Sequence, residues 1–252
     1  MPADRPLAHA QLLQLKRWNT PTIYNGWEQV TRHDTVRECV NHEETRDFMP
    51  EMGPMVGYAI TLVISAAAPG PRKANPDAFM QYLTFVASQP GPKIVVVQDL
   101  DKPEVLGSLW GEVCSNTHRA LGCVGTITDG AIRDFDEMRN AGFKAIARRF
   151  CVGHAHVWPQ RWNVPVEVFG TTVRPGDLIH ADKHGFLVIP PEDQERLLDA
   201  VTFMDGNECR TVIPAARGAA GLSSEQVLAN LAQSQRDFGA NVRAHFRRQG
   251  EW

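Results

Sequence analysis

The sequence predicts an α/β fold, and three observations lead to that prediction. Apolar runs typical of buried strands alternate with helical patterns between residues 57 and 148. Residues 164 to 190 then change to strands separated by turns. A chain of 252 residues with 43% hydrophobic and 22% charged residues can bury one sizeable core. Strands and helices that alternate at short intervals favour parallel pairing through right-handed crossovers.

The first hundred residues predict two helices and two strands. Leucines at helical spacing indicate a short amphipathic helix over residues 7 to 18. The next forty residues are polar and contain several prolines, so we expect irregular structure there. Residues 57 to 65 (GYAITLVIS) predict a buried strand, residues 77 to 88 a helix, and residues 93 to 100 (KIVVVQDL) the strongest strand of the chain.

The middle of the chain repeats this alternation twice. We expect a helix from about residue 108 to 121, a strand over 123–128, a helix from about 132 to 141 and a strand over 143–148. In open α/β sheets the ligand binds beyond the carboxyl ends of the strands. The loops that follow the second and third predicted strands are therefore the places where we expect a site.

The last third of the chain ends in helices. After the turn-rich strands, residues 191 to 204 predict one helix and the final thirty residues another, mostly polar one. We predict an α/β domain over residues 1–217 and a helical extension over 218–252. The extension needs a partner for its apolar row, so we expect it to serve as an oligomer contact. The apolar row consists of Val227, Leu231, Phe238, Val242 and Phe246.

Charge, cysteine content and hydropathy argue against several classes of protein. The net charge is -3 and the basic residues are scattered, so we expect no nucleic-acid partner. The five cysteines are odd in number and lack C-x-x-C spacing, which indicates free thiols in a reducing compartment. No apolar run is long enough to span a membrane, and the first residues are too polar for a signal peptide. We expect a cytoplasmic protein with no membrane partner.

One tripeptide, Arg-Asp-Phe, occurs three times, at residues 46–48, 133–135 and 236–238. Only in the middle copy do twenty residues separate the arginine from a preceding acid, Glu112, and two residues separate the aspartate from a following acid, Glu137. Its spacing is E-x20-R-D-x2-E, and this spacing separates a candidate site from an ordinary charged helix start. The corresponding residues are Asn25 and Pro50 for the first copy, and Ala215 and Ala240 for the third.

The residue types in this pattern suit one kind of chemistry. Glu112, Asp134 and Glu137 are three carboxylates without a histidine, a set suited to a hard cation such as Mg²⁺ or Mn²⁺. Asp134 and Glu137 are three apart, so we expect them to share one face of a helix. Arg133 presents a planar cation suited to a carboxylate or an enolate oxygen. Gly111 lets backbone come close to a ligand, and the N–H groups that follow Glu112 can receive an anion.

The spacing resembles the signature of the RraA-like family, which includes the class II pyruvate aldolases acting on 4-hydroxy-4-methyl-2-oxoglutarate. The resemblance extends over roughly residues 17 to 205 and includes residues 106–134 and 173–190. It implies a layered α/β/β/α sandwich of the swivelling β/β/α type with a C-terminal helical extension. The chain departs from the family pattern at Asn25, where an acid is usual, and in the length of its tail beyond Arg217.

The resemblance also implies roles for the motif residues. Asp134 would bind Mg²⁺ or Mn²⁺ directly, while Glu112 and Glu137 would hold metal-bound waters. Arg133 would contact the keto oxygen of a 2-oxo acid substrate, and Arg133 and Glu112 would be the catalytic residues. Family members form trimers or hexamers, so we expect a homo-oligomer of that kind. The substrate carboxylate would bind backbone N–H groups of Gly111, Glu112, Val113 and Cys114.

Three activities fit the pattern. The first is a metal-dependent lyase that cleaves a pyruvoyl-containing 4-hydroxy-2-oxo acid by retro-aldol reaction, with oxaloacetate decarboxylation as a side activity. The second is a metal-dependent hydrolase of a 2,4-diketo acid, which needs the same chelate. The third is a non-catalytic regulator that binds RNase E, and the four intact motif charges favour it least.

Other residues are weaker candidates. His154 and His156, at i and i+2 on an expected strand, would face the same way and could bind a metal. Without a third ligand in the sequence, we favour a pocket wall or a core position for both. Cys114 has no evident histidine partner, so we do not expect a nucleophile there. Trp110 and Trp158 are expected to be packing residues.

Overall fold

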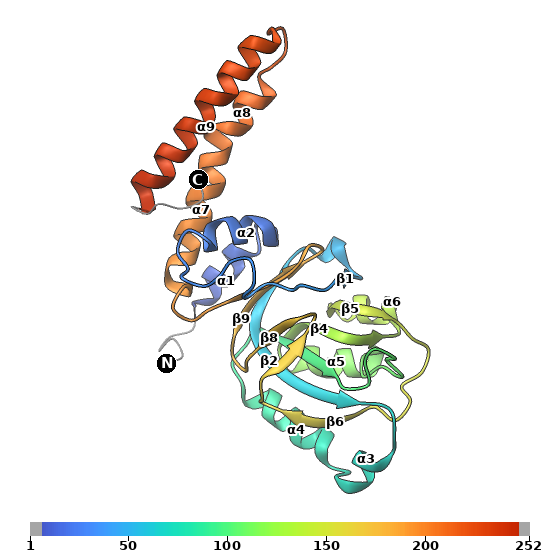
Figure 1. The fold of residues 1–252 in the computed structure, drawn as a ribbon. Helices are drawn as coiled ribbons and strands as arrows, with labels where there is room; N and C mark the ends of the chain where they lie inside the picture. Colours follow the sequence, from blue (N-terminus) through green and yellow to red (C-terminus); the bar gives the residue numbers. More distant parts are fainter. Residues whose placement is uncertain (1–6, 247–252) are drawn as a thin grey trace. The chain divides into compact units, whose positions relative to one another are not determined.

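The computed structural model describes residues 7–246, which form two compact units (Figure 1). Of the described residues, the first unit contains 7–20 and 33–192. The second unit contains residues 21–32 and 193–246. The division at residue 217, made from the sequence, stays a prediction.

The first unit is built on an eight-stranded sheet. Its strands are β1 (Arg46–Asp47), β2 (Met55–Ser65), β3 (Lys93–Asp99), β4 (Cys123–Ile132), β5 (Lys144–Phe150), β6 (Trp158–Trp162), β9 (Leu178–Asp182) and β10 (Gly185–Ile189). The spatial order is β1-β5-β4-β3-β2-β9-β10, and β6 pairs with β2 outside this path. The strands β2 to β5 pair in parallel, as the alternation with helices predicts. The other pairs of this sheet are antiparallel.

Alternating side chains give the sheet two apolar faces. In β3, Val95 and Val97 belong to one core, while Ile94 and Val96 belong to the other. Helices cover the first face: α4 (Ala78–Ser88), α5 (Glu112–Ala120) and α6 (Phe135–Asn140). The second face packs on β9, β10 and a separate hairpin of β7 (Val166–Val168) and β8 (Thr171–Val173). This layering confirms the predicted α/β fold class.

A buried lysine fixes the helices against the sheet. Lys93, at the start of β3, donates from Nζ to the carbonyl oxygens of Val86 and Leu121, both at 2.7 Å. These carbonyls lie near the C-terminal ends of α4 and α5, where a cation is favoured. The N-terminus of α5 is consequently held toward the opposite edge, where β3 and β4 end.

Several element boundaries differ from the sequence prediction. The first helix is α1 (His9–Leu15), followed by α2 (Thr20–Trp27) in a segment expected to be irregular. Pro21 lies in the first turn of α2, where a missing N–H costs nothing. The strand β4 continues to Ile132, four residues beyond the predicted end. Two short helices, η1 (Pro50–Met52) and α3 (Gly70–Ala74), complete the unit.

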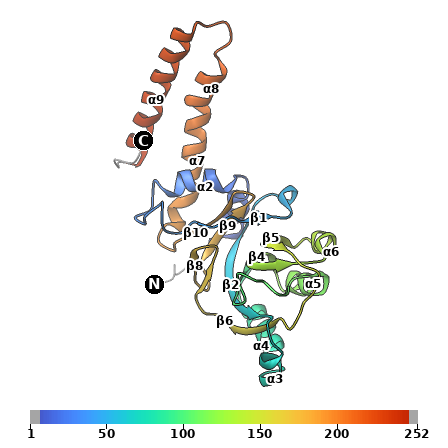
Figure 2. The same ribbon diagram turned by 45° about the vertical axis from the view of Figure 1, so that its right-hand side comes forward.

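The second unit is helical. It contains α2 from residue 21 onward, α7 (Gln194–Arg210), α8 (Val212–Arg217) and α9 (Ser224–Phe246), and α9 runs alongside α7 and α8 in Figures 1 and 2. Phe238 and Val242 of α9 are buried against Met204 of α7. Part of the predicted apolar row therefore has its partner within its own chain. Within residues 7–246, no helix combines the length and apolar character needed to cross a membrane.

The contact between α2 and α7 involves Asn25, where the chain departs from the expected acid. Asn25 donates from Nδ2 to Glu208 Oε1 at 3.2 Å, and Trp27 donates from Nε1 to Asp193 Oδ2 at 2.9 Å. A Cβ on Gly26 would lie 2.6 Å from Val201, so the two helices pack without space for a side chain at that position. The amide at position 25 thus serves helix packing.

Candidate functional site

A cavity of about 520 Å³ at the carboxyl ends of β3 and β4 contains most of the predicted site residues. The parallel pairing of β3 and β4 brings the two following loops together, as expected. Glu137 is not among the residues lining this cavity; it is exposed on α6, three residues after Asp134. The predicted residues that line the cavity are Gly111, Glu112, Val113, Cys114, Arg133 and Asp134.

Backbone and serine hydrogen bonds hold the two loops together. The Arg133 N–H donates to the Trp110 carbonyl at 3.2 Å, beside a bridge between Trp110 and Ile132. The buried Ser108 hydroxyl lies 2.8 Å from the Trp110 carbonyl and 2.7 Å from the Ala131 carbonyl. A hydroxyl has one proton, so it donates to one of these oxygens at a time. Ser108 therefore positions the segment that carries Arg133 relative to the start of α5.

Asp134 has an unusual backbone conformation. It is the N-cap of α6 with φ 52° and ψ 49°, in the left-handed region that is uncommon for residues other than glycine. Its carboxylate does not cap its own helix. Oδ2 instead accepts the Glu112 N–H at 3.1 Å and lies 3.9 Å from Arg133 Nε. Because Asp134 precedes the helix, the expectation that it shares a helical face with Glu137 is wrong.

Gly111 provides the space that the Asp134 carboxylate occupies. A Cβ on Gly111 would lie 2.6 Å from Asp134 Oδ2, which is too close, and 3.3 Å from Arg133 Nε, which is a tight contact. Within residues 7–246, no group of three His, Cys, Asp or Glu side chains forms a metal cage. Mg²⁺ usually retains several waters and binds one or two protein carboxylates. The all-oxygen donor set around Asp134 fits such an ion.

The N-terminus of α5 faces the same cavity. The first hydrogen bond of this helix runs from the Ser115 N–H to the Gly111 carbonyl at 2.9 Å. The N–H groups of a first turn have no acceptor within their own helix, and the helix dipole is positive there. The start of α5, from Gly111 to Cys114, can therefore bind a carboxylate through backbone N–H groups.

The cysteine of this segment is not suited to nucleophilic chemistry. Burial raises the pKa of the Cys114 thiol far above its ordinary value. Its Sγ lies 3.5 Å from Nδ1 of His118, whose pKa is lowered by burial to about 4. The other ring nitrogen, Nε2, is 3.0 Å from the Tyr82 hydroxyl in the core. A neutral thiol beside a neutral imidazole is a packing arrangement, and His118 is a histidine neighbour that the sequence analysis did not find.

The two histidines of residues 154 and 156 do not lie on a strand. They belong to an irregular loop, and β6 begins only at Trp158, so the prediction that both face the same way along a strand is wrong. His154 lines the cavity, and its Nδ1 lies 2.8 Å from the Ala155 carbonyl. The irregular backbone follows from the preceding Val-Gly pair, which carries no strand pattern.

Six further residues line the cavity and carry no signal in the motif. Arg72 lies in α3, in a segment rich in proline and glycine, and Phe79 lies at the start of α4, so the motif spacing does not point to them. Trp158, expected to be a packing residue, also lines the cavity, while Trp110 is buried in the core. The residues that the sequence analysis missed are Arg72, Phe79, Ser108, Leu109, Thr117 and Val157.

Two buried carboxylates lie where β3 and β4 end. The Asp99 N–H donates to Asp129 Oδ1 at 2.7 Å, and Asp129 forms an ion pair with Lys102. Asp99 Oδ2 is buried and has no hydrogen-bond partner within residues 7–246. Burial raises the pKa of Asp99 to about 6, an effect that the Asp101 N–H partly offsets. Asp99 therefore has a buried carboxylate oxygen without a hydrogen-bond partner among the described residues, which disfavours its charged form.

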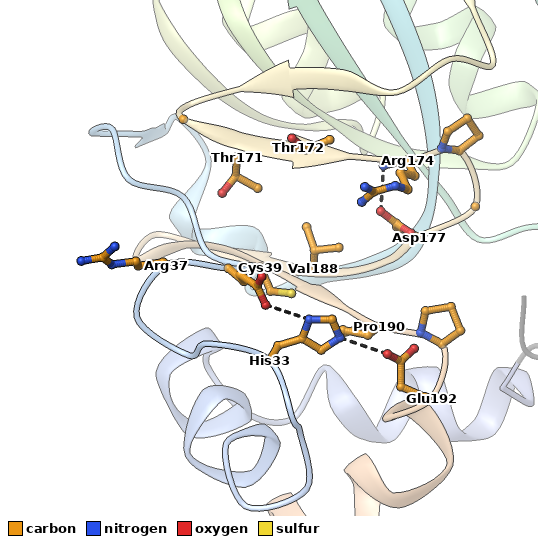
Figure 3. A pocket seen from close by; sticks show the side chains of 15 residues that line it. His33, Arg37, Cys39, Thr171, Thr172, Arg174, Asp177, Val188, Pro190 and Glu192 are labelled. Atoms are coloured by element: carbon orange, nitrogen blue, oxygen red, sulfur yellow. Dashed lines mark hydrogen bonds and ion pairs between the residues drawn. The ribbon is translucent and has the colours of Figure 1, made fainter. Parts of the chain in front are cut away.

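A larger cavity of about 710 Å³ lies elsewhere in the first unit (Figure 3). His33 bridges two acids there, with Nδ1 2.9 Å from Glu38 Oε2 and Nε2 3.0 Å from Glu192 Oε1. The hydrogen bond to Glu192 raises the pKa of His33, burial lowers it, and Glu38 raises it again. The Arg174 N–H is bonded to Asp177 Oδ2 at 2.7 Å. These groups pair with one another, and none belongs to the E-x20-R-D-x2-E pattern.

Comparison with known sequences identifies related proteins. A family model described as RraA-like, Aldolase/RraA, matches residues 20–188. A Halalkalibacterium halodurans protein named "Putative 4-hydroxy-4-methyl-2-oxoglutarate aldolase" is 31% identical over 130 residues, which are 50% of this chain and 59% of that protein. Protein DlpA of Legionella pneumophila is 27% identical over 133 residues, 52% of this chain and 21% of DlpA. The chain thus spans well under two thirds of the length of these curated relatives.

Comparison with solved structures identifies the same fold. An uncharacterized protein from Pseudomonas syringae superposes with a TM-score of 0.68 at 19% identity, covering 92% of this chain and 96% of that one. Streptomyces coelicolor RraAS2, described as an unusual member of the RNase ES inhibitor RraA protein family, has a TM-score of 0.64 at 22% identity. That match covers 83% of this chain and 97% of RraAS2. At these identities the similarity concerns the fold alone.

Proposed function

This chain belongs to the RraA-like family, and from that premise we propose that it is a divalent-metal-dependent lyase. Its substrate is a pyruvoyl-containing 4-hydroxy-2-oxo acid, which it cleaves by a retro-aldol reaction, with oxaloacetate decarboxylation as a side activity. One observation carries the proposal: Gly111, Glu112, Arg133 and Asp134 come from two separate loops and line one cavity.

The start of α5 binds the carboxylate of the pyruvoyl group. Its unsatisfied N–H groups and the positive end of its dipole attract an anion. Glu112 carries a side chain in the same turn, but its own N–H already donates to Asp134. The carboxylate is therefore received chiefly by the N–H groups of Val113 and Cys114.

Arg133 acts on the keto oxygen. When the bond between carbons 3 and 4 breaks, its electrons move toward the keto group and negative charge develops on that oxygen. A guanidinium held in place stabilises this charge more in the transition state than in the ground state. The hydrogen bond from the Arg133 N–H to the Trp110 carbonyl keeps its backbone beside α5.

Asp134 would hold a divalent cation directly, and Glu112 and Glu137 would contribute through water. When bound, Mg²⁺ or Mn²⁺ supplies Lewis acidity toward the substrate's oxygens. The oxygen-only donors, and the space that Gly111 leaves for the Asp134 carboxylate, support this assignment.

The protein acts as a homo-oligomer, a trimer or a hexamer, in the cytoplasm. Leu228 on α9 is 67% exposed, and Val227 and Leu231 are only partly buried, so this stretch of α9 has apolar surface left for a neighbour. Deletion of residues 221–252 followed by light scattering tests the role of the helix. An unchanged mass would restrict α9 to its own chain, and a monomeric full-length protein would contradict the oligomer.

The activity is tested by assaying oxaloacetate decarboxylation and the cleavage of a panel of 2-oxo acids with and without EDTA. We expect turnover that EDTA abolishes and that Mg²⁺ or Mn²⁺ restores. Activity that persists in EDTA, or no turnover on any 2-oxo acid, would contradict the proposal. Product analysis with a 2,4-diketo acid separates a lyase from a hydrolase.

A further inference from the structure

The cavity that contains Arg133 has a second group of lining side chains, which the proposed reaction does not use. Arg72 comes from α3, Phe79 from α4 and Trp158 from β6. These three elements lie side by side in Figures 1 and 2. A cavity of about 520 Å³ is within the range that accommodates drug-sized ligands, so it has room beyond a pyruvoyl group.

Two contacts to one indole hold Arg72 in place. Its guanidinium carbon lies 4.8 Å from the centroid of the Trp158 ring, within the range of a cation–π interaction. The same indole donates from Nε1 to the Asn75 carbonyl, at the C-terminal end of α3, at 3.0 Å. The ring of Phe79 lies 6.1 Å from Trp158 and supports it from α4. Arg72 is therefore attached to the cavity wall although its side chain is exposed.

The guanidinium of Arg72 has its hydrogen-bonding edge available. Within residues 7–246 Arg72 forms no salt bridge, and stacking on an aromatic ring engages only the face of the guanidinium. The carboxylates that line the cavity are Glu112 and Asp134, and Asp134 lies beside Arg133. On the part of the wall formed by α3, α4 and β6, the positive charge of Arg72 therefore has no carboxylate beside it among the residues that line the cavity.

We propose that Arg72 is a specificity-determining residue of this chain, which binds the second carboxylate of a 2-oxo dicarboxylate substrate. The first carboxylate binds the start of α5, the carbon chain lies against the apolar wall that includes Phe79 and Val157, and the second carboxylate meets the Arg72 fork. This inference rests on the proposed function, since it assumes that a 2-oxo acid occupies the cavity.

The test compares two ligands that differ by the second carboxylate. Binding of pyruvate and of 2-oxoglutarate to the full-length protein is measured by calorimetry in the presence of Mg²⁺. Arg72→Gln removes the charge and keeps a similar length, and Arg72→Lys keeps the charge without the fork. Arg17→Gln is the matched control, because Arg17 also stacks on a tryptophan, Trp18, at 5.9 Å and does not line the cavity.

We expect Arg72→Gln to weaken 2-oxoglutarate binding about 10- to 100-fold, the effect of losing hydrogen bonds to a charged group, and to change pyruvate binding less than about twofold. Arg72→Lys should give an intermediate loss, and Arg17→Gln none. Equal losses for both ligands, or no loss for either, would overturn the role of Arg72 while the proposed function stands. Failure of both ligands to bind the wild-type protein would overturn the proposed function and this inference together.

Discussion

Two cavities in the first unit, the one beside His33 and the one beside Arg133, differ in size and in how their charged groups are arranged. The larger one, at about 710 Å³, contains His33 between two glutamates and the Arg174 backbone bonded to Asp177. The smaller one, at about 520 Å³, brings Arg133, Asp134 and the N-terminus of α5 together at the ends of parallel strands. In the first, His33 is paired with two glutamates; in the second, polar groups converge on space that a ligand can fill.

The comparison shows that the arrangement of polar groups identifies a site better than volume does. The Asp134 carboxylate does not cap its own helix and instead accepts a hydrogen bond from Glu112 in the other loop. This strained conformation persists only where neighbouring residues hold it in place. Gly111 and Ser108 supply that support in the smaller cavity. The larger cavity instead has His33 and Glu192 bonded across its wall, in the arrangement of a structural ion pair (Figure 3).

The largest effect is expected for Arg133→Ala, which should lower turnover by about 10²- to 10³-fold, the cost of losing one stabilising group at a developing oxyanion. The side chain is 36% exposed, so stability should change by less than about 0.5 kcal/mol. Steady-state kinetics and thermal melting check both parts.

The matched control is Arg236→Ala, in the copy of the Arg-Asp-Phe tripeptide on α9, where Arg236 donates hydrogen bonds to Gln233 of its own helix. Arg46 is a poorer control, because its guanidinium packs 4.6 Å from the ring of Phe48. A comparable loss of turnover in Arg236→Ala would contradict the conclusion that only the middle Arg-Asp-Phe copy belongs to the site.

A smaller but specific effect is expected for Gly111→Ala. The added methyl would lie 2.6 Å from Asp134 Oδ2, so the carboxylate has to move. Disturbing the surroundings of a metal ligand typically costs about 10- to 100-fold in metal affinity, and we expect a loss of this size for Mg²⁺ or Mn²⁺ by calorimetry. Gly70→Ala is the control, since a Cβ there meets no atom within 4 Å. Unchanged metal affinity in Gly111→Ala would argue against Asp134 as the ligand.

Asp99→Asn should stabilise the protein at neutral pH. Burial raises the folded-state pKa of Asp99 to about 6, so the folded protein holds this proton more tightly than the unfolded chain. The wild-type protein therefore loses stability as pH rises from about 4 to 6, and the loss persists above pH 6. We expect the variant to gain on the order of 1 kcal/mol at pH 7 and nothing at pH 4, measured by urea unfolding. A gain that does not depend on pH would contradict this origin.

The smallest effect is expected in the larger cavity. His33→Gln should leave turnover unchanged and lower stability by no more than about 0.5 kcal/mol, because the imidazole and its acids are partly exposed. The raised pKa of His33 means that its contribution is full below about pH 6.5 and disappears as pH rises through the folded-state pKa. Urea unfolding at pH 5.5 and pH 8 measures the difference. A loss of turnover in this variant would move the candidate site to the larger cavity.

The sheet and its covering helices could be predicted because local patterns determine them. Alternating apolar residues in β3 supply both cores, and turn residues separate β9 from β10. The helix α2 was missed because Pro21 reads as a breaker, whereas in a first turn it is tolerated. The extension of β4 was missed because Asp129 reads as a loop residue, and its burial depends on Lys102, a partner distant in sequence.

The candidate site was partly predictable for a topological reason. Glu112 and Arg133 follow neighbouring parallel strands, so their spacing along the chain reflects their proximity in the fold. Arg72 has no such relation, because its place in the cavity depends on Trp158, in a strand far along the sequence. The left-handed conformation of Asp134 also gives no local signal, since it arises from the contact with Glu112 of another loop.

The separation of Arg72 from Arg133 has a consequence for how such an enzyme can diversify. The segment around α3 lies between β2 and α4, outside the two loops that carry the motif. Changes there alter one wall of the cavity and leave the hydrogen bonds around Ser108, Gly111 and Asp134 intact. If Arg72 contacts the substrate as proposed, a library confined to residues 66–77 should vary substrate preference while the motif residues stay constant, and related proteins could acquire different substrates through changes in this segment alone.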